Sequence, residues 1–191
     1  MRQATIQRNT RETQIFLSLN LDGTGNAEIE SGVGFFNHML ELLTVHSAFD
    51  LKLTCKGDTW VDDHHSVEDV GIALGLALKE ALGDKRGIRR FSDHIVPMDE
   101  TCALVALDIS GRAYLSFMPE MKGKVGSFDL ELVEEFLRAF TSNAGLNLYV
   151  DLLKRGNSHH EAEGIFKALA KCLQDATEVV SDRIPSSKGV I

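Results

Sequence analysis

An internal repeat with a period near 95 residues restricts the fold of this chain more than any other feature of its sequence. Two adjacent histidines followed three residues later by a glutamate occur twice. The copies are His64-His65-x-x-Glu68 and His159-His160-x-x-Glu163. The pattern around each copy has the same order: strands, a helix, a strand, and a helix that begins near the histidines. A repeat of this length predicts two equivalent halves related by pseudo-symmetry.

Apolar periodicity predicts the elements of each half. In the first half we expect strands over residues 13–21 and 49–55, a helix over 35–46, and a buried helix after the first cluster that ends at Gly83. Turn residues at 22–25 predict a hairpin partner for the first strand. In the second half we expect strands over 98–107, 113–118 and 146–150, a helix over 130–140, and a buried helix after the second cluster.

The expected fold class is α+β. We expect the two tandem halves to pack their sheets side by side with helices covering one face, which is a two-layer sandwich. The boundary is expected near residues 84–89, which gives halves 1–86 and 87–191. Each half has only two helices to cover one sheet, so we expect residues 1–191 to form one catalytic unit.

The spacing within each cluster indicates metal binding. On a helix, His64 and His65 lie four and three residues from Glu68, so the three side chains share one sector of the surface. Neighbouring histidines diverge by about 100° around a helix, which favours bridging between two metal sites. A single histidine pair is more often a solvated surface feature. Four of the seven histidines fall into two identical clusters, and this favours the metal interpretation.

Composition excludes several classes of function. The chain has 28 acidic and 20 basic residues and a net charge of −8, which argues against nonspecific binding to nucleic acid or to an anionic membrane. No apolar run approaches a membrane span, and residues 1–15 lack the apolar stretch of a signal peptide, so we expect a cytoplasmic protein. Cys55, Cys102 and Cys172 are widely spaced and are expected to be free thiols.

Six motifs in order resemble one family along essentially the whole chain. They are Gly34-Phe35-Phe36-Asn37-His38-Met39-Leu40, Asp62-Asp63-His64-His65-Ser66-Val67-Glu68-Asp69, Leu107-Asp108-Ile109-Ser110-Gly111-Arg112, His159-His160-Glu161-Ala162-Glu163, Phe166-Lys167-Ala168 and Pro185-Ser186-Ser187-Lys188-Gly189. Together they resemble imidazoleglycerol-phosphate dehydratase of histidine biosynthesis.

The resemblance implies a carbon–oxygen lyase that converts imidazoleglycerol phosphate to imidazoleacetol phosphate and water, with two Mn²⁺ ions per active site. It also implies tandem halves like domain 2 of ribosomal protein S5, and a homo-oligomer of 24 subunits built from trimers. The family's metal ligands correspond to His38, His64, His65, Glu68, His159, His160 and Glu163.

One position departs from the family pattern as we align it. The resemblance implies a further histidine ligand eleven residues before the second histidine of the second cluster, and this chain has Tyr149 there. A phenol is a poor neutral ligand. The departure implies weaker binding of one metal, a water in the ligand's place, or a substitute side chain; alternatively, Tyr149 is an ordinary strand residue.

Further roles follow from the resemblance alone. Glu12 corresponds to the acid-base residue that also contacts substrate, and the metal ligand Glu163 is a second candidate for proton transfer. Independently of the resemblance, Asp99 and Glu100 lie at the start of an expected strand and are either partners of the site or exposed charges. The resemblance assigns phosphate binding to Arg90, Arg112, Lys167, Ser186 and Lys188. Ser186 and Lys188 lie in a C-terminal loop that we expect to close over the substrate.

Two other classes of function use similar residues. A dinuclear metallohydrolase also needs clustered histidines and carboxylates, in that case to make a hydroxide nucleophile. A catalytically weak protein in which metals only stabilise an oligomer is the second alternative, favoured by Tyr149. The six ordered motifs favour the dehydratase over both.

Overall fold

A computed structural model describes residues 2–191; Met1 lies outside the described residues. The first half contains β1 (Gln3–Asn9), β2 (Thr13–Asn20), β3 (Ala27–Glu30), α1 (Gly34–Ser47), β4 (Asp50–Gly57) and α2 (His64–Leu82). The second contains β5 (Phe91–Met98), β6 (Thr101–Asp108), β7 (Tyr114–Phe117), β8 (Lys124–Val125), β9 (Phe128–Asp129), α3 (Leu132–Ala144), β10 (Asn147–Lys154) and α4 (Ser158–Thr177). The fold class is α+β, as the sequence predicts.

The two four-stranded sheets have the same topology. The first has the order β1-β2-β4-β3 and the second the order β5-β6-β10-β7. In each sheet an antiparallel hairpin comes first, and the third strand lies at the opposite edge, parallel to the fourth. The repeat in the sequence therefore corresponds to a repeat in the fold.

The hairpin predicted from the turn at residues 22–25 does not form. β2 pairs with β1 and β4, while β3 pairs in parallel with the far edge of β4. The Asp50 carboxylate accepts the backbone N–H groups of Thr24 and Asn26, at 2.9 and 3.0 Å. These bonds direct the chain past the end of β4 instead of back along β2. The chain does turn at the start of this segment, as predicted. The direction in which the chain leaves the turn is set by Asp50, which is distant in the sequence.

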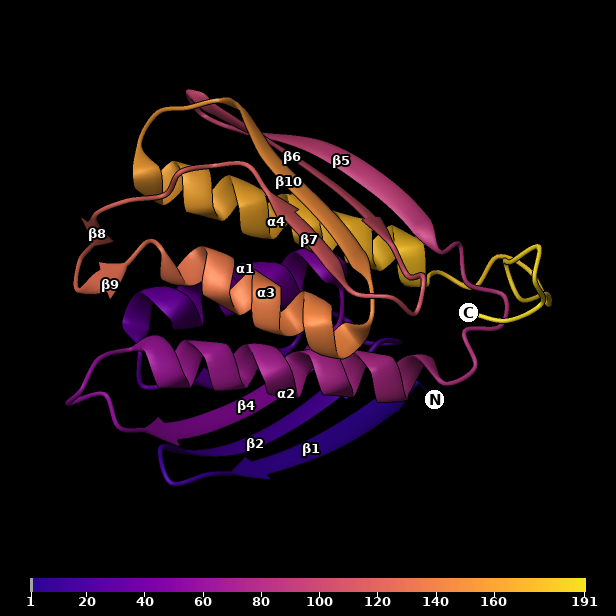
Figure 1. Ribbon diagram of the computed structural model, residues 1–191, viewed down its shortest axis with the longest axis horizontal. Helices are drawn as coiled ribbons and strands as arrows, with labels where there is room; N and C mark the ends of the chain where they lie inside the picture. The colour runs from indigo at the N-terminus through magenta and orange to yellow at the C-terminus, as the bar shows by residue number, and fades with distance from the viewer. Residues whose placement is uncertain (1) are drawn as a thin grey trace.

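The halves meet through their helices, which differs from the expected side-by-side sheets. Figure 1 shows α1 and α2 against one sheet, α3 and α4 against the other, and all four helices between the two sheets. Strands of both sheets alternate buried and more exposed side chains, so that Leu17 and Leu53 of one sheet and Val105 and Val150 of the other face the helices. The apolar area that has to be buried explains this arrangement, because one core of helices shared by both halves covers the apolar faces of both sheets.

Two glycines allow the closest contact between the halves. A Cβ added to Gly75 of α2 would lie 2.6 Å from the carbonyl oxygen of Phe140 and 2.9 Å from the backbone nitrogen of Ala144, both in α3. A Cβ on Gly71 would lie 2.8 Å from the carbonyl oxygen of Phe136. These distances are to backbone atoms that a rotamer change cannot move, so α2 and α3 approach at a distance that only glycine permits.

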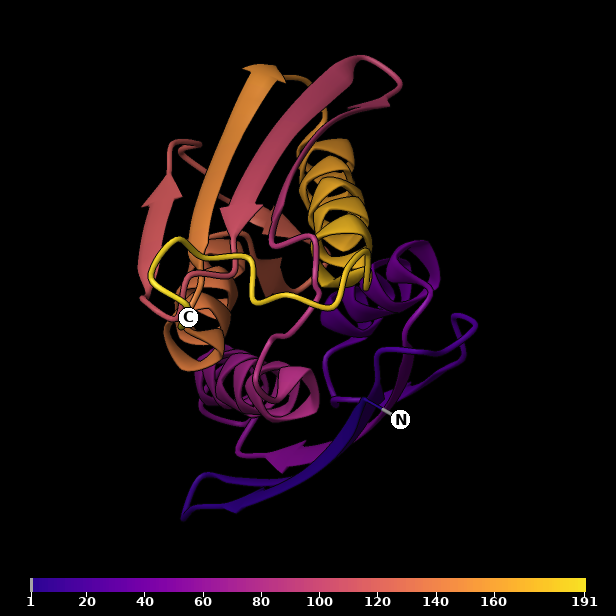
Figure 2. The same ribbon diagram turned by 90° about the vertical axis from the view of Figure 1, so that its right-hand side faces the viewer.

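The arrangement places chain segments at two opposite ends of the molecule. α2 and α4 both begin at the left-hand end in Figure 1 and run toward the end that carries the C-terminal segment. Figure 2 looks at this second end, where the C-terminal segment crosses the surface. In residues 2–191 no helix has the length and apolar character needed to span a membrane.

Gly75→Ala is expected to lower the free energy of unfolding by about 1–3 kcal/mol, because the clash with α3 outweighs the higher helix propensity of alanine. Gly34→Ala in α1 is the matched control, since a Cβ there meets nothing within 4 Å. Urea unfolding measures both. Equal stability of the Gly75→Ala variant and the wild type would contradict this packing.

Candidate active site at the helix N-termini

The same local device begins both histidine helices. The Asp62 carboxylate accepts the backbone N–H of His64 at 2.8 Å, and the Asn157 side-chain oxygen accepts that of His159 at 2.9 Å. A short polar side chain two residues before the histidine thus satisfies a free N–H group of the first turn. Each histidine pair therefore sits on a fixed helix start.

The second cluster is completed by α1. The Nε2 atoms of His38 and His159 both lie near Glu163 Oε1, at 2.9 and 3.1 Å, and the other oxygen of Glu163 accepts a 2.6 Å bond from Lys167 Nζ. The Phe35 ring packs edge-on against His159 with centroids 5.1 Å apart. Potential ligand atoms of His38, His159 and Glu163 all lie within 4.8 Å of one another. The structure thus brings these three predicted ligands together, with the predicted substrate residue Lys167.

Glu163 is held as an anion. Burial by itself raises the pKa of this carboxyl, but hydrogen bonds from Lys167, His38 and His159 lower it to about 2. Its side chain is only 10% exposed, whereas the imidazoles of His38 and His159 are about 40% exposed. A buried anion facing two accessible imidazoles has the donor chemistry of a divalent-metal site.

His160 faces a different set of carboxylates. Its Nδ1 lies 3.0 Å from Glu100 and 4.0 Å from Asp99, and potential ligand atoms of the three residues again lie within 4.8 Å of one another. The backbone N–H of Asn157 donates to Glu100, and with the His160 contact this lowers the pKa of Glu100 to about 2. Glu100 therefore contacts His160, and Asp99 lies at the limit of an ion pair with the same imidazole.

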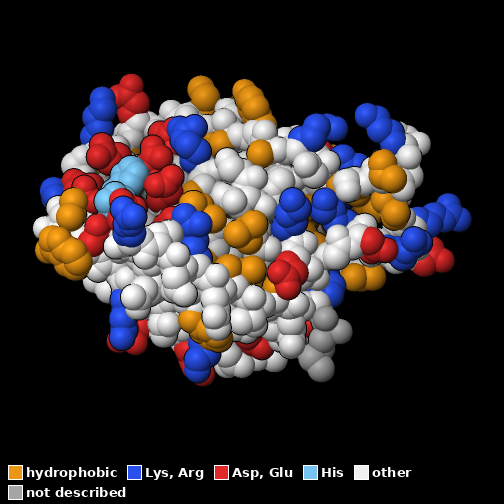
Figure 3. All heavy atoms as spheres, turned by 60° about the horizontal axis from the view of Figure 1, so that its bottom comes forward, with side chains coloured by type: hydrophobic (Ala, Val, Ile, Leu, Met, Phe, Trp, Pro, Cys, Tyr) orange, Lys and Arg blue, Asp and Glu red, His pale blue; other side chains and the backbone are white. Residues whose placement is uncertain are grey.

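The first cluster is more open. His65 Nδ1 lies 3.1 Å from Asp58, and this hydrogen bond raises the pKa of His65. The predicted acid-base residue Glu12 lies 3.7 Å from His65 Nε2, and His64 Nε2 lies 3.8 Å from Glu68. In Figure 3 histidine side chains are surrounded by acidic ones at the left-hand end. The structure thus places Glu12 beside the histidines, from a hairpin 50 residues earlier in the sequence.

Two buried carboxylates that the sequence interpretation missed hold the loops around these clusters. Asp69 accepts bonds from Arg8 and from the Thr13 hydroxyl, which fixes the hairpin that carries Glu12. Glu161 pairs with Arg155 at 2.9 Å and fixes the loop before α4. Asp69 follows Glu68 and Glu161 follows His160 in the sequence. This adjacency to the clusters is the only sequence feature that could have indicated their role.

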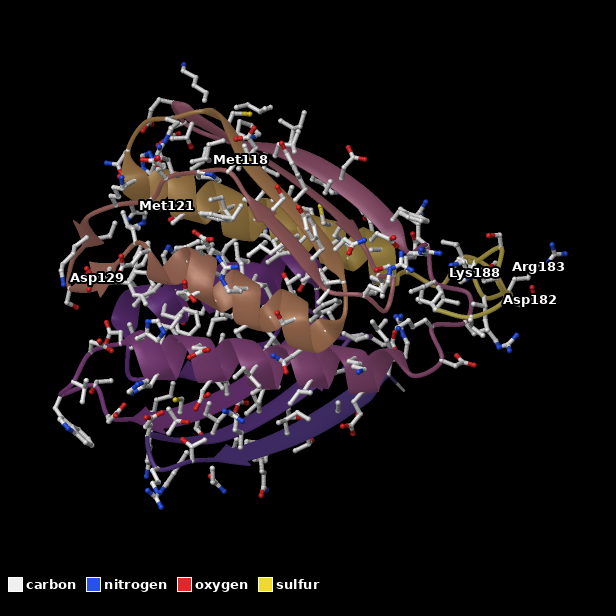
Figure 4. All side chains as sticks on the ribbon, in the orientation of Figure 1. Met118, Met121, Asp129, Asp182, Arg183 and Lys188 are labelled. Atoms are coloured by element: carbon white, nitrogen blue, oxygen red, sulfur yellow. The ribbon has the colours of Figure 1, made fainter. Side chains whose placement is uncertain are left out.

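The other predicted phosphate residues lie at the opposite end. Arg90 pairs with Asp108 at 2.6 Å and donates to the carbonyl oxygen of Pro185, the residue before Ser186. Figure 4 shows Lys188 at the C-terminal end and Asp129 at the other. Asp129 belongs to β9, whose Phe128 packs on the Phe35 ring at the histidine end. A single chain therefore does not bring Arg90, Ser186 and Lys188 to its own histidines.

Tyr149 also lies away from the histidines of its own chain. It is on β10 with 41% of its surface exposed, between the buried residues Leu148 and Val150. The buried residues of β10 face the helices, so the Tyr149 side chain points to the outer face of the second sheet. α4, which carries the second cluster, packs on the inner face. The ligand position that the family alignment indicated is therefore on the wrong face of the sheet to reach this chain's second cluster.

Comparisons with known proteins establish the class of the protein as a hydro-lyase, a carbon–oxygen lyase that removes water. The sequence model of the imidazoleglycerol-phosphate dehydratase family matches residues 31–173. The chain belongs to this family, whose dehydratases act in histidine biosynthesis.

Relatives cover the full chain. The imidazoleglycerol-phosphate dehydratase of Clostridioides difficile is 53% identical, with 100% of each chain covered, and that of Azorhizobium caulinodans is 55% identical, with 100% of this chain and 99% of the relative covered. The crystal structure of the Staphylococcus aureus enzyme has a TM-score of 0.85 at 45% identity, covering 93% of this chain and 99% of its own. The crystal structure of the Pyrococcus furiosus enzyme has a TM-score of 0.85 at 32% sequence identity. The match covers 97% of this chain and 100% of the Pyrococcus chain.

Glu163→Gln tests the charge of the buried carboxylate. Since its pKa is lowered from 4.5 to about 2, Glu163 adds stability that is complete above the ordinary value and is lost as the pH falls toward 2. The difference in unfolding free energy between wild type and variant is therefore expected to shrink as the pH falls through this range, in urea unfolding at several pH values. Glu68→Gln is the control, since the Glu68 side chain is 47% exposed. A difference independent of pH would contradict the assignment.

Proposed function

We propose that the protein converts imidazoleglycerol phosphate to imidazoleacetol phosphate and water, with two divalent metal ions, Mn²⁺ by family resemblance, held at the duplicated clusters. One observation carries the proposal: His38 from α1 meets His159 and Glu163 from α4 in a compact group. This group needs both halves of the fold. A pair of histidines that merely capped a helix would not require a third ligand from another element.

The chain offers a donor set that fits such ions. His38, His159 and Glu163 would form one group, His160 points to a second, and His64, His65 and Glu68 would supply the remaining imidazoles and carboxylate. Imidazole and carboxylate donors suit Mn²⁺ and also accept Zn²⁺ or Fe²⁺. Ions held by these residues would favour the deprotonated form of the substrate's imidazole ring, and this electron-rich ring would supply the electron pair that expels the hydroxyl group.

The structure supports dividing the roles of the two acidic candidates. The reaction breaks the C–O bond at the carbon attached to the imidazole and the C–H bond at the next carbon; the hydroxyl leaves as water, and the enol that forms becomes the ketone. A carboxylate with a pKa of about 2 is a weak proton acceptor, so Glu163 serves as a ligand. Glu12, with 52% of its side chain exposed beside His65, is the proton acceptor.

Binding of the substrate's phosphate group requires a second copy of the chain. α2 begins at His64 and ends beside the segment that carries Arg90, and its 19 residues span about 28 Å. Imidazoleglycerol phosphate, with three carbons between ring and phosphate, is far shorter. Arg90, Arg112, Ser186 and Lys188 from a neighbouring copy would bind the phosphate beside the histidines of the first copy, together with its Lys167. This geometry supports the homo-oligomer, which we propose is the 24-subunit assembly of trimers.

Metal content and turnover test the proposal. We expect two Mn²⁺ ions per chain, formation of imidazoleacetol phosphate, and loss of both after chelation. His159→Ala should reduce turnover by more than the roughly 10–100-fold typical of losing a residue that only supports a ligand. His94→Ala is the control, because His94 pairs with Asp175 outside the clusters.

Two results would contradict the proposed reaction. Bound metal without turnover, combined with dissociation of the oligomer after chelation, would indicate a purely structural role for the metal. Release of inorganic phosphate from the substrate, without imidazoleacetol phosphate, would indicate a metallohydrolase instead.

A further inference from the structure

Lys85 is a largely buried residue whose ammonium still reaches solvent and has no partner within residues 2–191. The residue is only 7% exposed, and its ammonium forms no hydrogen bond or ion pair within residues 2–191. By contrast, the nearby Arg86, Arg89 and Arg90 all pair with carboxylates. The ammonium of Lys85 is therefore available to an anion that approaches from solvent.

The surroundings of Lys85 are positively charged. Burial lowers the pKa of its ammonium, and the charges of Lys79 and Arg90 lower it further. Asp108 does not compensate, because both of its oxygens already bind Arg90, at 2.6 and 3.1 Å. The local field therefore favours an anion at this place, in a protein whose net charge is −8.

The backbone here is held in an uncommon conformation. Lys85 and Arg90 have φ values of 60° and 76°, in the left-handed region that residues other than glycine and asparagine rarely adopt. Such strain persists only where the surroundings impose it, and it is concentrated at functional sites. The strained segment presents two cations at one end of the molecule.

Two further segments reach the same place. A Cβ added to Gly111 would lie 3.6 Å from Lys85 Nζ and 3.1 Å from the backbone carbon of Ile191. The turn with Gly111 also carries Arg112, whose exposed side chain has no ion pair within the described residues. The C-terminal segment in addition contacts Arg90 through the Pro185 carbonyl. Cationic residues thus come from two parts of the chain, the segment with Lys85 and Arg90 and the turn with Arg112, and the C-terminal segment lies against both.

From this geometry we propose that Lys85 binds the phosphate group of the substrate directly, as a further substrate-binding residue beside Arg90 and Arg112. The proposal rests on the proposed function and adds a residue to it. A compact ammonium with three donors suits a phosphate monoester dianion, and the guanidinium groups supply the paired contacts. The ligand would supply the anionic partner that the described residues do not give to the Lys85 ammonium.

Lys85→Met tests this assignment, with inorganic phosphate as the probe. The melting temperature of each full-length variant is measured with and without phosphate, and KM and kcat are measured with imidazoleglycerol phosphate. We expect the phosphate-induced shift to be lost and KM to rise about 10–100-fold with a smaller change in kcat. Without phosphate the variant should melt no lower than the wild type, because the Lys85 ammonium has no hydrogen bond or ion pair to lose within residues 2–191. Lys79→Met, an exposed neighbour of equal charge, should behave as wild type.

The opposite pattern overturns the assignment. A phosphate-induced shift and a KM equal to those of the wild type would show that Lys85 does not bind phosphate, and a lowered melting temperature in addition would make it a structural residue that holds the C-terminal segment. Lys85→Gln, which keeps a donor, is the second variant if methionine disrupts the loop. If the wild type fails to turn over imidazoleglycerol phosphate, the proposed function fails, whereas the phosphate-induced shift still tests Lys85 separately.

Discussion

Helix-on-helix packing between the two halves is the contact on which the candidate site depends. α2 lies against α3 at a distance set by Gly71 and Gly75, and α1 lies against α4. The second contact brings His38 to Glu163, which lie 125 residues apart in the sequence. If the halves packed through their sheets, His38 would have no partner. The stability of the core and the composition of the site therefore rest on the same interface.

The two halves share a fold but differ in chemistry. Both histidine helices begin with an Asx residue that binds the backbone of the first histidine of the pair. The glutamate three residues after the pair then differs: Glu68 is half exposed, whereas Glu163 is buried and bound by Lys167. The position that corresponds to Lys167 in the first half is Ile72, so the first cluster has no ammonium to compete for its carboxylate. Pseudo-symmetric ligands therefore need not give equivalent metal sites.

Sequence patterns predicted the four helices, most strands and the repeat. Family resemblance named His38 as a ligand, but only the structure groups it with His159 and Glu163. The patterns failed where a distant contact decides: Asp50 redirects the turn at residues 22–25, and the sheets share one helical core instead of lying side by side. Lys85 is one of several charges in a polar stretch, and its burial depends on the approach of Gly111 and the C-terminal segment. Local periodicity contains no information about such contacts.

The central claim is that each active site combines the histidines of one copy with the cationic end of another. Subunit complementation tests it directly: a His159→Ala chain and a Lys188→Ala chain, each inactive alone, are unfolded, mixed in equal amounts and reassembled. Random mixing of chains should give about one quarter of the sites both intact parts, so activity should return to about a quarter of the wild-type value. Mixed oligomers that form but remain inactive would contradict the claim, because they would place both parts of the site in one chain.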